Sequence, residues 1–349
     1  MIAPRRPAEV PRAWTVADLL AWTEAHFKKH SIPSPRLDAE LLLAHALGCT
    51  RLEIYTGWRK VVEPPERLRF RALIERRGKG EPVAYITGAR EFHSLRFEVS
   101  PAVLIPRPET EHLVDAVLEH LARLAREAPG APGASGEAAA AGESSDPGSG
   151  GAGPASLGPP RETAVLDIGT GSGNIAVAIA VEVPAARIAA VDASSEALEV
   201  AGRNAAAHGV AGRIEFLQGD LFEPLRGRDP RPLFDAIASN PPYIPPRDRG
   251  TLPADVRDFE PGLALFDCRE GPDGDGLGFH RAIARGAPEF LAPGGILAME
   301  VGLGQAPAVQ DLLRAAGFSS VRAISDYGGI PRVVLGLAGS PLPGTAGPA

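Results

Sequence analysis

Residues 239–244, Ser-Asn-Pro-Pro-Tyr-Ile, combine groups that suit the binding of a planar amide or amine. Two consecutive prolines stiffen the backbone and remove two N–H donors, so the carbonyl oxygens there are left free to accept hydrogen bonds from another molecule. Asn240 adds a side-chain carbonyl acceptor, and Tyr243 adds a flat aromatic face. The segment therefore suits a carboxamide or a nucleobase amine. For these residues alone, a proline-rich turn after a strand is the alternative interpretation.

A second motif lies upstream, where an apolar run at 165–168 leads into the glycine-rich turn 169–173, Gly-Thr-Gly-Ser-Gly. Glycines permit a tight turn and let a ligand approach the backbone. The next apolar run ends at Asp192, where a carboxylate can accept hydrogen bonds from ribose hydroxyls. Asn174 occupies the last glycine position of the dinucleotide-binding pattern, so the turn suits a nucleoside with an amino-acid tail better than a pyrophosphate.

The elements around both motifs alternate between strands and helices. Strands are predicted at 165–168, 187–191, 213–218, 234–238, 295–301, 321–324 and 332–335, with helices near 109–126, 175–183, 195–208 and 279–290. Ligands in such sheets bind at the carboxyl ends of strands, where Gly169, Asp192, Asp220 and Asn240 all fall. Asp220 is predicted to accept a hydrogen bond from an adenine amine, with Leu221 against the ring. A helix or turn cap is the alternative role for Asp220.

Together the two motifs resemble those of class I S-adenosylmethionine methyltransferases that modify amide or amino nitrogen. More narrowly, the chain is similar to the release factor glutamine methyltransferases, from about residue 15 to about residue 336. The narrower resemblance depends on flanking segments: Glu-Pro-Val-Ala-Tyr-Ile-Thr-Gly at 81–88, Glu91-Phe92, Leu-Ile-Pro-Arg-Pro-Glu-Thr-Glu at 104–111, Glu260-Pro261, Ala-Leu-Phe at 264–266 and Gly276-Leu277.

The resemblance implies an α/β class I methyltransferase fold, a Rossmann-like and mostly parallel seven-stranded sheet with helices on both faces. A small N-terminal helical bundle (1–80) and a β-hairpin linker (81–104) would precede the methyltransferase domain (105–337). Within that domain, residues 128–160 are almost wholly Ala, Gly, Ser, Pro and acidic residues. Such a segment has too little apolar surface to offset its ordering entropy, so we expect a flexible insertion there and a flexible tail at 338–349.

The bundle is expected to contain four helices. Their predicted starts are Thr15, Ser34-Pro35, Thr50 and Pro64-Pro65. Capping residues and prolines are typical of such positions. On the second helix, Leu37, Leu41, Leu42, Ala44 and Leu47 are expected to face the core.

The resemblance also implies the cofactor, the substrate and the site. S-adenosylmethionine would donate a methyl group to the side-chain amide nitrogen of the glutamine in the Gly-Gly-Gln motif of class-1 peptide-chain release factors. The substrate amide would be held by Asn240, Pro241, Pro242 and Tyr243. The predicted cofactor-binding residues are Gly169, Thr170, Gly171, Ser172, Gly173, Asp192, Asp220, Leu221 and Asn240.

Three other functions stay open. The chain could modify a glutamine of a ribosomal protein, because a sister family shares the Asn-Pro-Pro-Tyr motif. An adenine-N6 nucleic-acid methyltransferase would use similar pocket chemistry, but no basic stripe is evident. The third alternative is a non-catalytic adaptor that binds S-adenosylmethionine, and the presence of two intact motifs argues against it.

Composition limits the partners and the location. The formal net charge of −7 gives no sign of a broad nucleic-acid-binding face. Two distant cysteines, Cys49 and Cys268, indicate a reducing compartment and no cysteine metal site. No apolar run is long enough to span a membrane. We therefore expect a cytoplasmic monomer that binds no metal, nucleic acid or membrane.

Overall fold

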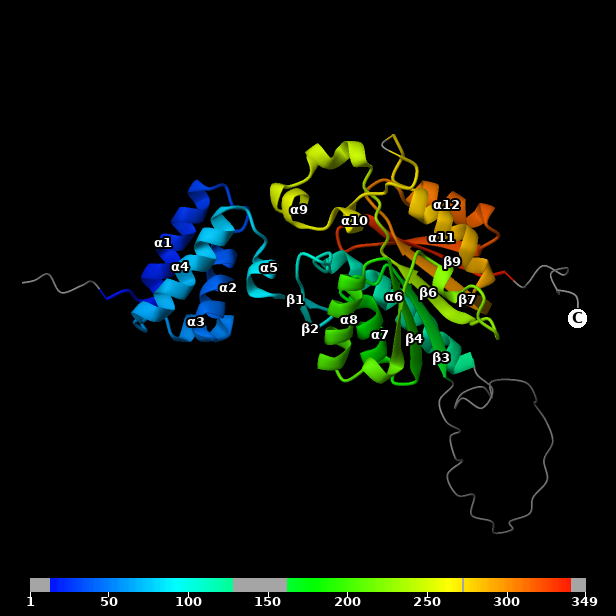
Figure 1. Cartoon of the computed structure of the whole chain (residues 1–349), viewed down its shortest axis with the longest axis horizontal. Coiled ribbons are helices and arrows are strands. Elements are labelled where there is room, and N and C mark those ends of the chain that lie inside the picture. Colours follow the sequence, from blue (N-terminus) through cyan, green and yellow to red (C-terminus); the bar gives the residue numbers. More distant parts are fainter. Residues whose placement is uncertain (1–12, 128–161, 272, 340–349) are drawn as a thin grey trace, which may run out of the picture. The chain divides into compact units, whose positions relative to one another are not determined.

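The computed structural model describes residues 13–127, 162–271 and 273–339 of the chain. The predicted insertion at 128–160 and most of the predicted tail lie outside these ranges. The chain divides into two compact units (Figure 1). The first extends to Ala89 and also includes Leu252–Phe259, and the second contains Arg90–Thr251 and the chain from Glu260 onward.

The first unit is built from helices whose starts agree with the sequence. They are α1 (Val16–Lys29), α2 (Pro35–Leu47), α3 (Arg51–Thr56) and α4 (Pro64–Gly78), followed by the short α5 (Val83–Thr87) and, later in the chain, α9 (Ala254–Phe259). Thr15 and Asp18 form a capping box at α1, and Thr50 and Glu53 form another at α3. Each box satisfies backbone donors that would otherwise lack partners.

The buried face of α2 differs from the predicted one. Leu42 and Ala44 are buried as expected, but Leu37 is 41% exposed, whereas Asp38 and Glu40 are buried. Ion pairs explain the difference, because Arg77 Nε donates to Asp38 at 2.8 Å and Arg36 Nε donates to Glu40 at 2.5 Å. Polar residues that find charged partners can thus occupy positions that an apolar pattern assigns to leucine.

The linker between the bundle and the sheet is a shorter hairpin than expected. Only β1 (Ala89–Phe92) and β2 (Leu95–Glu98) form strands, and the first part of the predicted 81–104 hairpin is helix α5. Pro82 precedes this helix, and Gly88 ends it with a φ of 71°. Proline at a helix start and left-handed glycine at its end explain the helical turn, which the alternation of residue types obscured.

The second unit contains the predicted seven-stranded sheet, with strand order β5-β4-β3-β6-β7-β9-β8. The strands are β3 (Thr163–Ile168), β4 (Ala186–Asp192), β5 (Ile214–Gln218), β6 (Phe234–Ser239), β7 (Leu291–Glu300), β8 (Ser319–Ser325) and β9 (Pro331–Leu337). The first five run parallel, and β9 pairs antiparallel with both β7 and β8. The fold class expected from the sequence is therefore confirmed.

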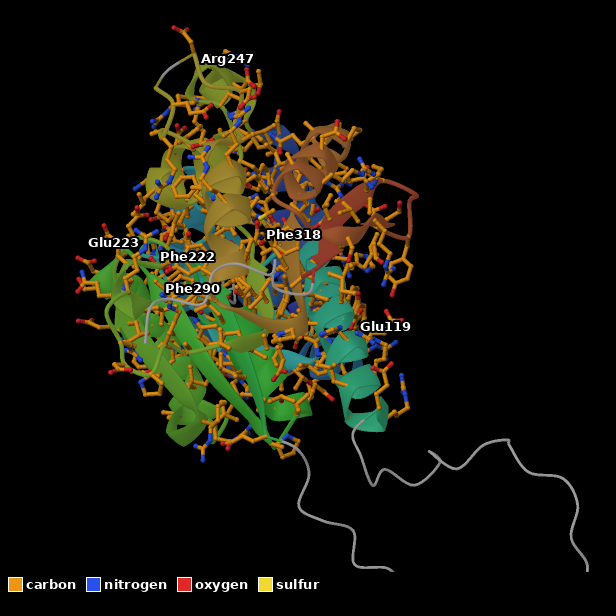
Figure 2. The ribbon with its side chains drawn as sticks, turned by 90° about the vertical axis from the view of Figure 1, so that its right-hand side faces the viewer. Glu119, Phe222, Glu223, Arg247, Phe290 and Phe318 are labelled. Carbon is orange, nitrogen blue, oxygen red and sulfur yellow. The ribbon has the colours of Figure 1, made fainter. Side chains whose placement is uncertain are left out.

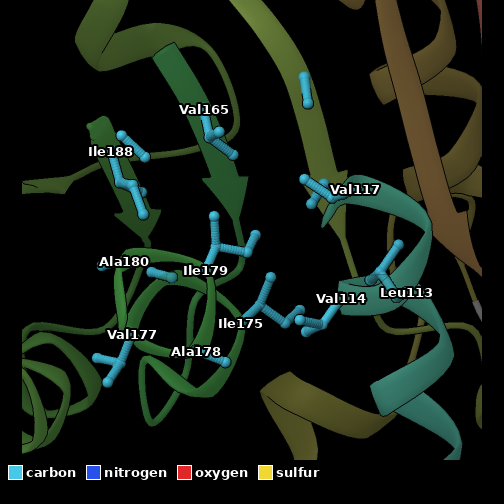
Figure 3. Packing of buried hydrophobic residues seen from close by; sticks show 14 of the residues in the cluster. Leu113, Val114, Val117, Val165, Ile175, Val177, Ala178, Ile179, Ala180 and Ile188 are labelled. Carbon is cyan, nitrogen blue, oxygen red and sulfur yellow. The ribbon is translucent and has the colours of Figure 1, made fainter. Parts of the chain in front are cut away.

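Helices cover both faces of the sheet (Figure 1). On one face, α6 (Glu111–Glu127) and α7 (Asn174–Glu182) pack against alternate strand residues. Val165 of β3 and Ile188 of β4 meet Ile175 and Ile179 of α7 there, beside Val117 of α6 (Figure 3). Helix α8 (Ser195–Ala207) contributes to this same core.

The opposite face packs against α11 (Gly278–Gly286) and α12 (Ala306–Ala315). Its core takes the strand residues between those of the first face, such as Leu166 and Val191. Phe222 and Phe290 stack under α11 with ring centroids 5.1 Å apart (Figure 2). Apolar residues on both faces of the strands explain their near-continuous hydrophobic runs.

Candidate active site

The candidate site lies where the strand order reverses. From β3 the chain builds β4 and β5 on one side and then returns to place β6 on the other side. Ile168 pairs with Val191 of β4 and with Ser239 of β6, so the glycine turn emerges between Asp192 and Asn240. A reversal of this kind opens a crevice at the carboxyl ends of the strands, which is the common ligand site in such sheets.

A cavity of about 220 Å³ occupies this crevice, and all its lining residues belong to the second unit. Of the residues predicted from the sequence, ten line it: Gly169, Thr170, Gly171, Ser172, Asp192, Asp220, Leu221, Asn240, Pro241 and Pro242. Gly173 and Tyr243 lie outside the lining. The structure thus brings together most of the predicted site.

The glycine turn needs its glycines for backbone conformation. Gly169 and Gly171 have φ values of 73° and 54°, in the left-handed region that side chains disfavour. Among the described residues, nothing lies within 4 Å of the place where a side chain at either position would begin. The turn therefore offers bare backbone to the cavity, as a closely approaching ligand requires.

Gly173 has a different role. It precedes α7 with a φ of 78°, and a Cβ atom there would lie 3.0 Å from the Cβ of Ala201 on α8. Gly173 thus permits close packing between two helices.

Asp167 is buried behind the glycine turn and forms hydrogen bonds to it, a role that the sequence analysis did not predict. Its Oδ2 accepts hydrogen bonds from Thr170 Oγ1 at 2.6 Å and from the Ala176 backbone N–H at 3.2 Å. Burial raises the pKa of Asp167 to about 7, against the lowering effect of these bonds. The carboxyl group connects the turn to the first turn of α7.

Asp192 is the acidic residue at the end of β4. Its two oxygens accept hydrogen bonds from the backbone N–H groups of Gly171 at 2.8 Å and Ser194 at 3.0 Å. Burial raises the pKa of this carboxyl group, and the backbone bonds act in the opposite direction. Each carboxylate oxygen can accept a second bond, so Asp192 retains acceptors that suit ribose hydroxyls.

Asn240 presents an acceptor at the cavity. Its Nδ2 donates to Thr110 Oγ1 at 3.1 Å, and Thr110 Oγ1 donates to Glu300 Oε2 at 2.6 Å. Neither the Asn240 side-chain oxygen nor the Pro241 carbonyl makes a hydrogen bond with another described residue. Both atoms are therefore available for a ligand N–H group.

Tyr243 follows the prolines but is anchored away from the cavity. Its backbone carbonyl accepts a hydrogen bond from Gln305 Nε2 at 3.0 Å, so that carbonyl is already engaged. Burial raises the pKa of its phenol, so the hydroxyl stays protonated. Two glycines leave room for this residue. A Cβ at Gly276 would clash with the Tyr243 carbonyl, and one at Gly302 would lie 3.0 Å from its ring.

Asp220 also lines the cavity, and its carboxylate already has a partner. Arg269 Nη2 donates to Asp220 Oδ1, and the Arg269 guanidinium lies 4.5 Å from the centre of the Phe279 ring. The second carboxylate oxygen remains an acceptor, so the predicted bond to an adenine amine stays a prediction. Arg269 was not predicted, because its loop carries no motif of its own.

These residues fit S-adenosylmethionine. Bare backbone at Gly169 and Gly171 suits the close approach of the amino-acid part, and Asp192 suits a ribose.

Four further residues of the site region were not predicted: Thr110, Arg107 and the buried carboxyls Glu260 and Glu300. Glu260 accepts from the Ile105 backbone N–H at 3.1 Å and from Arg107 at 2.5 Å, which fixes the segment before α6. Of these residues, only Glu300 carries a sequence signal, because it is a carboxylate at the end of an apolar strand.

The described residues contain neither a metal-binding cluster nor a membrane-spanning helix. No three of their His, Cys, Asp and Glu side chains are grouped in a way that would hold a metal ion. Nor does any of their helices have the length and apolar character needed to cross a bilayer.

Comparison with known proteins identifies the family. A model of the PrmC N-terminal domain matches residues 18–88, and a model of the methyltransferase small domain matches residues 155–251. The chain is 40% identical over 333 residues to the release factor glutamine methyltransferase of Geobacter sulfurreducens, covering 95% of this chain and 99% of that protein. The enzyme of the same name from Rhodopirellula baltica is 40% identical over 329 residues, covering 92% and 95%.

Among solved structures, a protein-(glutamine-N5) methyltransferase (release factor-specific) from Alicyclobacillus acidocaldarius is 32% identical. The match covers 70% of this chain and 100% of that one, with a TM-score of 0.37. The matches to the two curated relatives cover 95% and 92% of this chain, so they extend over both units. This chain belongs to the release factor glutamine methyltransferase family.

Proposed function

We propose that this protein transfers the methyl group of S-adenosylmethionine to the side-chain amide nitrogen of the glutamine in the Gly-Gly-Gln motif of class-1 release factors. Membership of the family supports the reaction and the substrate. The observation that carries the proposal is a pair of acceptors, Asn240 Oδ1 and the Pro241 carbonyl, which have no hydrogen-bond partner among the described residues. Both residues line the cavity at the glycine turn.

The two acceptors match the two N–H bonds of a primary amide. Hydrogen bonds to both would fix the plane of the amide and direct its nitrogen toward the methyl donor. A carboxamide nitrogen is a poor nucleophile, because its lone pair is delocalised into the carbonyl group. When bound, S-adenosylmethionine supplies an activated methyl group. The protein has mainly to align the amide nitrogen with that group and to stabilise the charge that develops on the nitrogen.

Acceptors at the amide N–H groups also favour the reaction itself. Positive charge develops on the nitrogen as the new N–C bond forms, and carbonyl oxygens aimed at its hydrogens stabilise that charge. Pro242 keeps the segment stiff, and Tyr243 anchors it through Gln305. The nitrogen then loses one proton, and water is the simplest acceptor for it.

The cofactor would bind along the glycine turn, with its ribose hydroxyls at Asp192. Leu221 and Asp220 line the part of the cavity that we assign to the adenine. None of the described residues of the first unit lines this cavity, so we assign that unit to recognition of the release factor body.

Methyl transfer from radiolabelled S-adenosylmethionine tests the proposal. The purified enzyme would be incubated separately with release factor, ribosomes and duplex DNA, and the labelled product identified by mass spectrometry. We expect label on the glutamine of the release factor. Label only on a ribosomal protein or only on DNA would contradict the assignment, and binding of the cofactor without any transfer would indicate an adaptor.

A further inference from the structure

A chain of hydrogen bonds runs from the cavity into the interior behind it. Asn240 Nδ2 donates to Thr110 Oγ1 at 3.1 Å, and Thr110 Oγ1 donates to Glu300 Oε2 at 2.6 Å. Thr110 is 1% exposed and Glu300 is 3% exposed, so water does not compete for these bonds. The three residues come from the loop after β6, the 3-10 turn before α6 and the end of β7.

The direction of this chain follows from proton counting. A threonine hydroxyl has a single hydrogen, and here Thr110 gives it to the Glu300 carboxylate, which can only accept. Thr110 can then only accept from Asn240, so it must face the NH2 end of that side chain. The carbonyl end of Asn240 is thereby turned toward the ligand side.

We propose that Thr110 and Glu300 are positioning residues for methyl transfer, and that the ionised Glu300 carboxylate selects the orientation of Asn240 that accepts a hydrogen bond from the substrate amide. This inference rests on the proposed function for its substrate. It concerns residues that touch neither the methyl group nor the reacting nitrogen.

Protonation of Glu300 reverses the logic. A neutral carboxyl group can donate to Thr110, which frees the threonine hydrogen for the carbonyl end of Asn240. The NH2 end of Asn240 would then face the substrate NH2, and two donors do not bind each other. The hydrogen-bond chain Asn240–Thr110–Glu300, called the relay below, therefore has an active and an inactive orientation of Asn240. The two differ by one proton on Glu300.

Several charged groups surround the Glu300 carboxyl group. Its pKa is raised to about 7, chiefly by burial and further by Glu109, while the Thr110 bond, Arg332 and Arg107 lower it. Tyr243 is also close: the pKa of its phenol is raised chiefly by burial and further by the negative charge of Glu300. His280 of α11 bonds the Glu300 backbone carbonyl through Nε2 at 2.8 Å, and burial lowers its pKa so that it stays neutral.

The variants Thr110→Val and Thr110→Ser test the relay in the full-length enzyme. Valine keeps the shape but removes the hydroxyl, so we expect kcat on release factor to fall by up to about 100-fold. The Kd for S-adenosylmethionine, measured by calorimetry, should be unchanged, and serine should restore most of the rate. Thr163→Val is the matched control, because Thr163 is buried at the opposite end of β3 and its hydroxyl has no partner among the described residues.

The pH profile separates positioning from packing. For the wild type we expect kcat to rise as the pH passes through about 7, as Glu300 ionises. The glutamine in Glu300→Gln cannot ionise, and its amide can bond Thr110 in either direction. The rise of kcat near pH 7 should therefore vanish, and kcat should lie between the low-pH and high-pH values of the wild type. A Glu300→Gln enzyme that keeps the step, or a Thr110→Val enzyme with wild-type rate and profile, would overturn the proposal.

A second measurement is independent of activity. The NMR signals of the Asn240 side-chain NH2 should titrate near pH 7 in the wild type and lose this transition in both Thr110→Val and Glu300→Gln. If the wild type methylates no release factor but shows this titration, the proposed function fails and the relay stands. If it methylates release factor and the signals do not titrate, the relay alone is wrong.

Discussion

At the scale of single residues, Asn240 has two hydrogen-bonding ends with different duties. Its NH2 end is engaged with Thr110, and its carbonyl end is unengaged within the described chain. Asp192, in contrast, is already held by two backbone donors and keeps its remaining lone pairs for a ligand. Under the proposed function, Asn240 would accept from the substrate on the β6 side and Asp192 from the cofactor on the β4 side.

Asn240→Ala should abolish methyl transfer while S-adenosylmethionine still binds. Alanine removes the acceptor that orients the substrate amide, and the loss of such a group at a transition state typically costs at least about 100-fold in kcat. The rate would be followed with labelled cofactor and the binding by calorimetry. Near-normal turnover would contradict the substrate role, and lost cofactor binding would show that Asn240 serves both ligands.

Asp192→Ala should weaken S-adenosylmethionine binding by ~1–3 kcal/mol, the usual cost of leaving buried polar partners unpaired. Part of this loss would arise inside the protein, since Gly171 and Ser194 also lose their acceptor. Asp192→Asn keeps one acceptor, which can hold the backbone N–H of Gly171 or of Ser194 but not both, so it should weaken binding as well. Unchanged affinity in the alanine variant would place the ribose contact elsewhere.

The sequence identified the residues that carry local signals and missed those that depend on distant partners. The glycine turn, Asp192 and Asn240 stand at strand ends within recognisable motifs. Thr110 and Glu300 are separated by 190 positions. The pairing of β6 with β7 places Glu300 near Asn240, and the packing of α6 against these strands brings Thr110 there. A single sequence contains no local pattern for such a contact, so the relay could not be predicted.

At the scale of elements, the sheet was predictable because its central strands, such as β3, β6 and β7, are long apolar runs buried on both faces. The seven predicted strands and the four bundle helices agree with the structure within a few residues. The predicted hairpin and the buried face of α2 were wrong in part. In both places local chemistry, a proline–glycine pair or an ion pair, prevailed over the apolar pattern.

Gly286→Ala should destabilise the protein by ~1–3 kcal/mol, the usual cost of overpacking. A Cβ atom at this position would lie 2.6 Å from the Phe222 ring, which is itself stacked on Phe290. Gly202→Ala in α8 is the matched control, because nothing described lies within 4 Å there and alanine favours helix by ~0.5–1 kcal/mol. Urea unfolding that ranks the two variants equally would show that α11 adapts to the extra methyl.

At the scale of the whole molecule, the two units have separate cores, and we propose that they have separate functions. The first unit has its own apolar core, including Phe27, Leu42 and Phe70, and none of its residues from 13 onward lines the cavity. It also takes in Leu252–Phe259, where Asp255 lies 3.8 Å from Arg77. This later segment was not predicted, because nothing in its sequence links it to the bundle.

Removal of residues 1–88 should therefore leave S-adenosylmethionine binding intact but strongly reduce methylation of intact release factor. The amide is a weak nucleophile, and contacts far from it supply the binding energy that orients it. A short glutamine peptide provides the control, since it lacks those contacts and should be a poor substrate for the full-length and truncated enzymes alike. Because residues 252–259 lose their partners in the truncated form, its unfolding must first be shown to remain cooperative. A folded, truncated enzyme that methylates release factor at the full-length rate would assign recognition to the second unit instead.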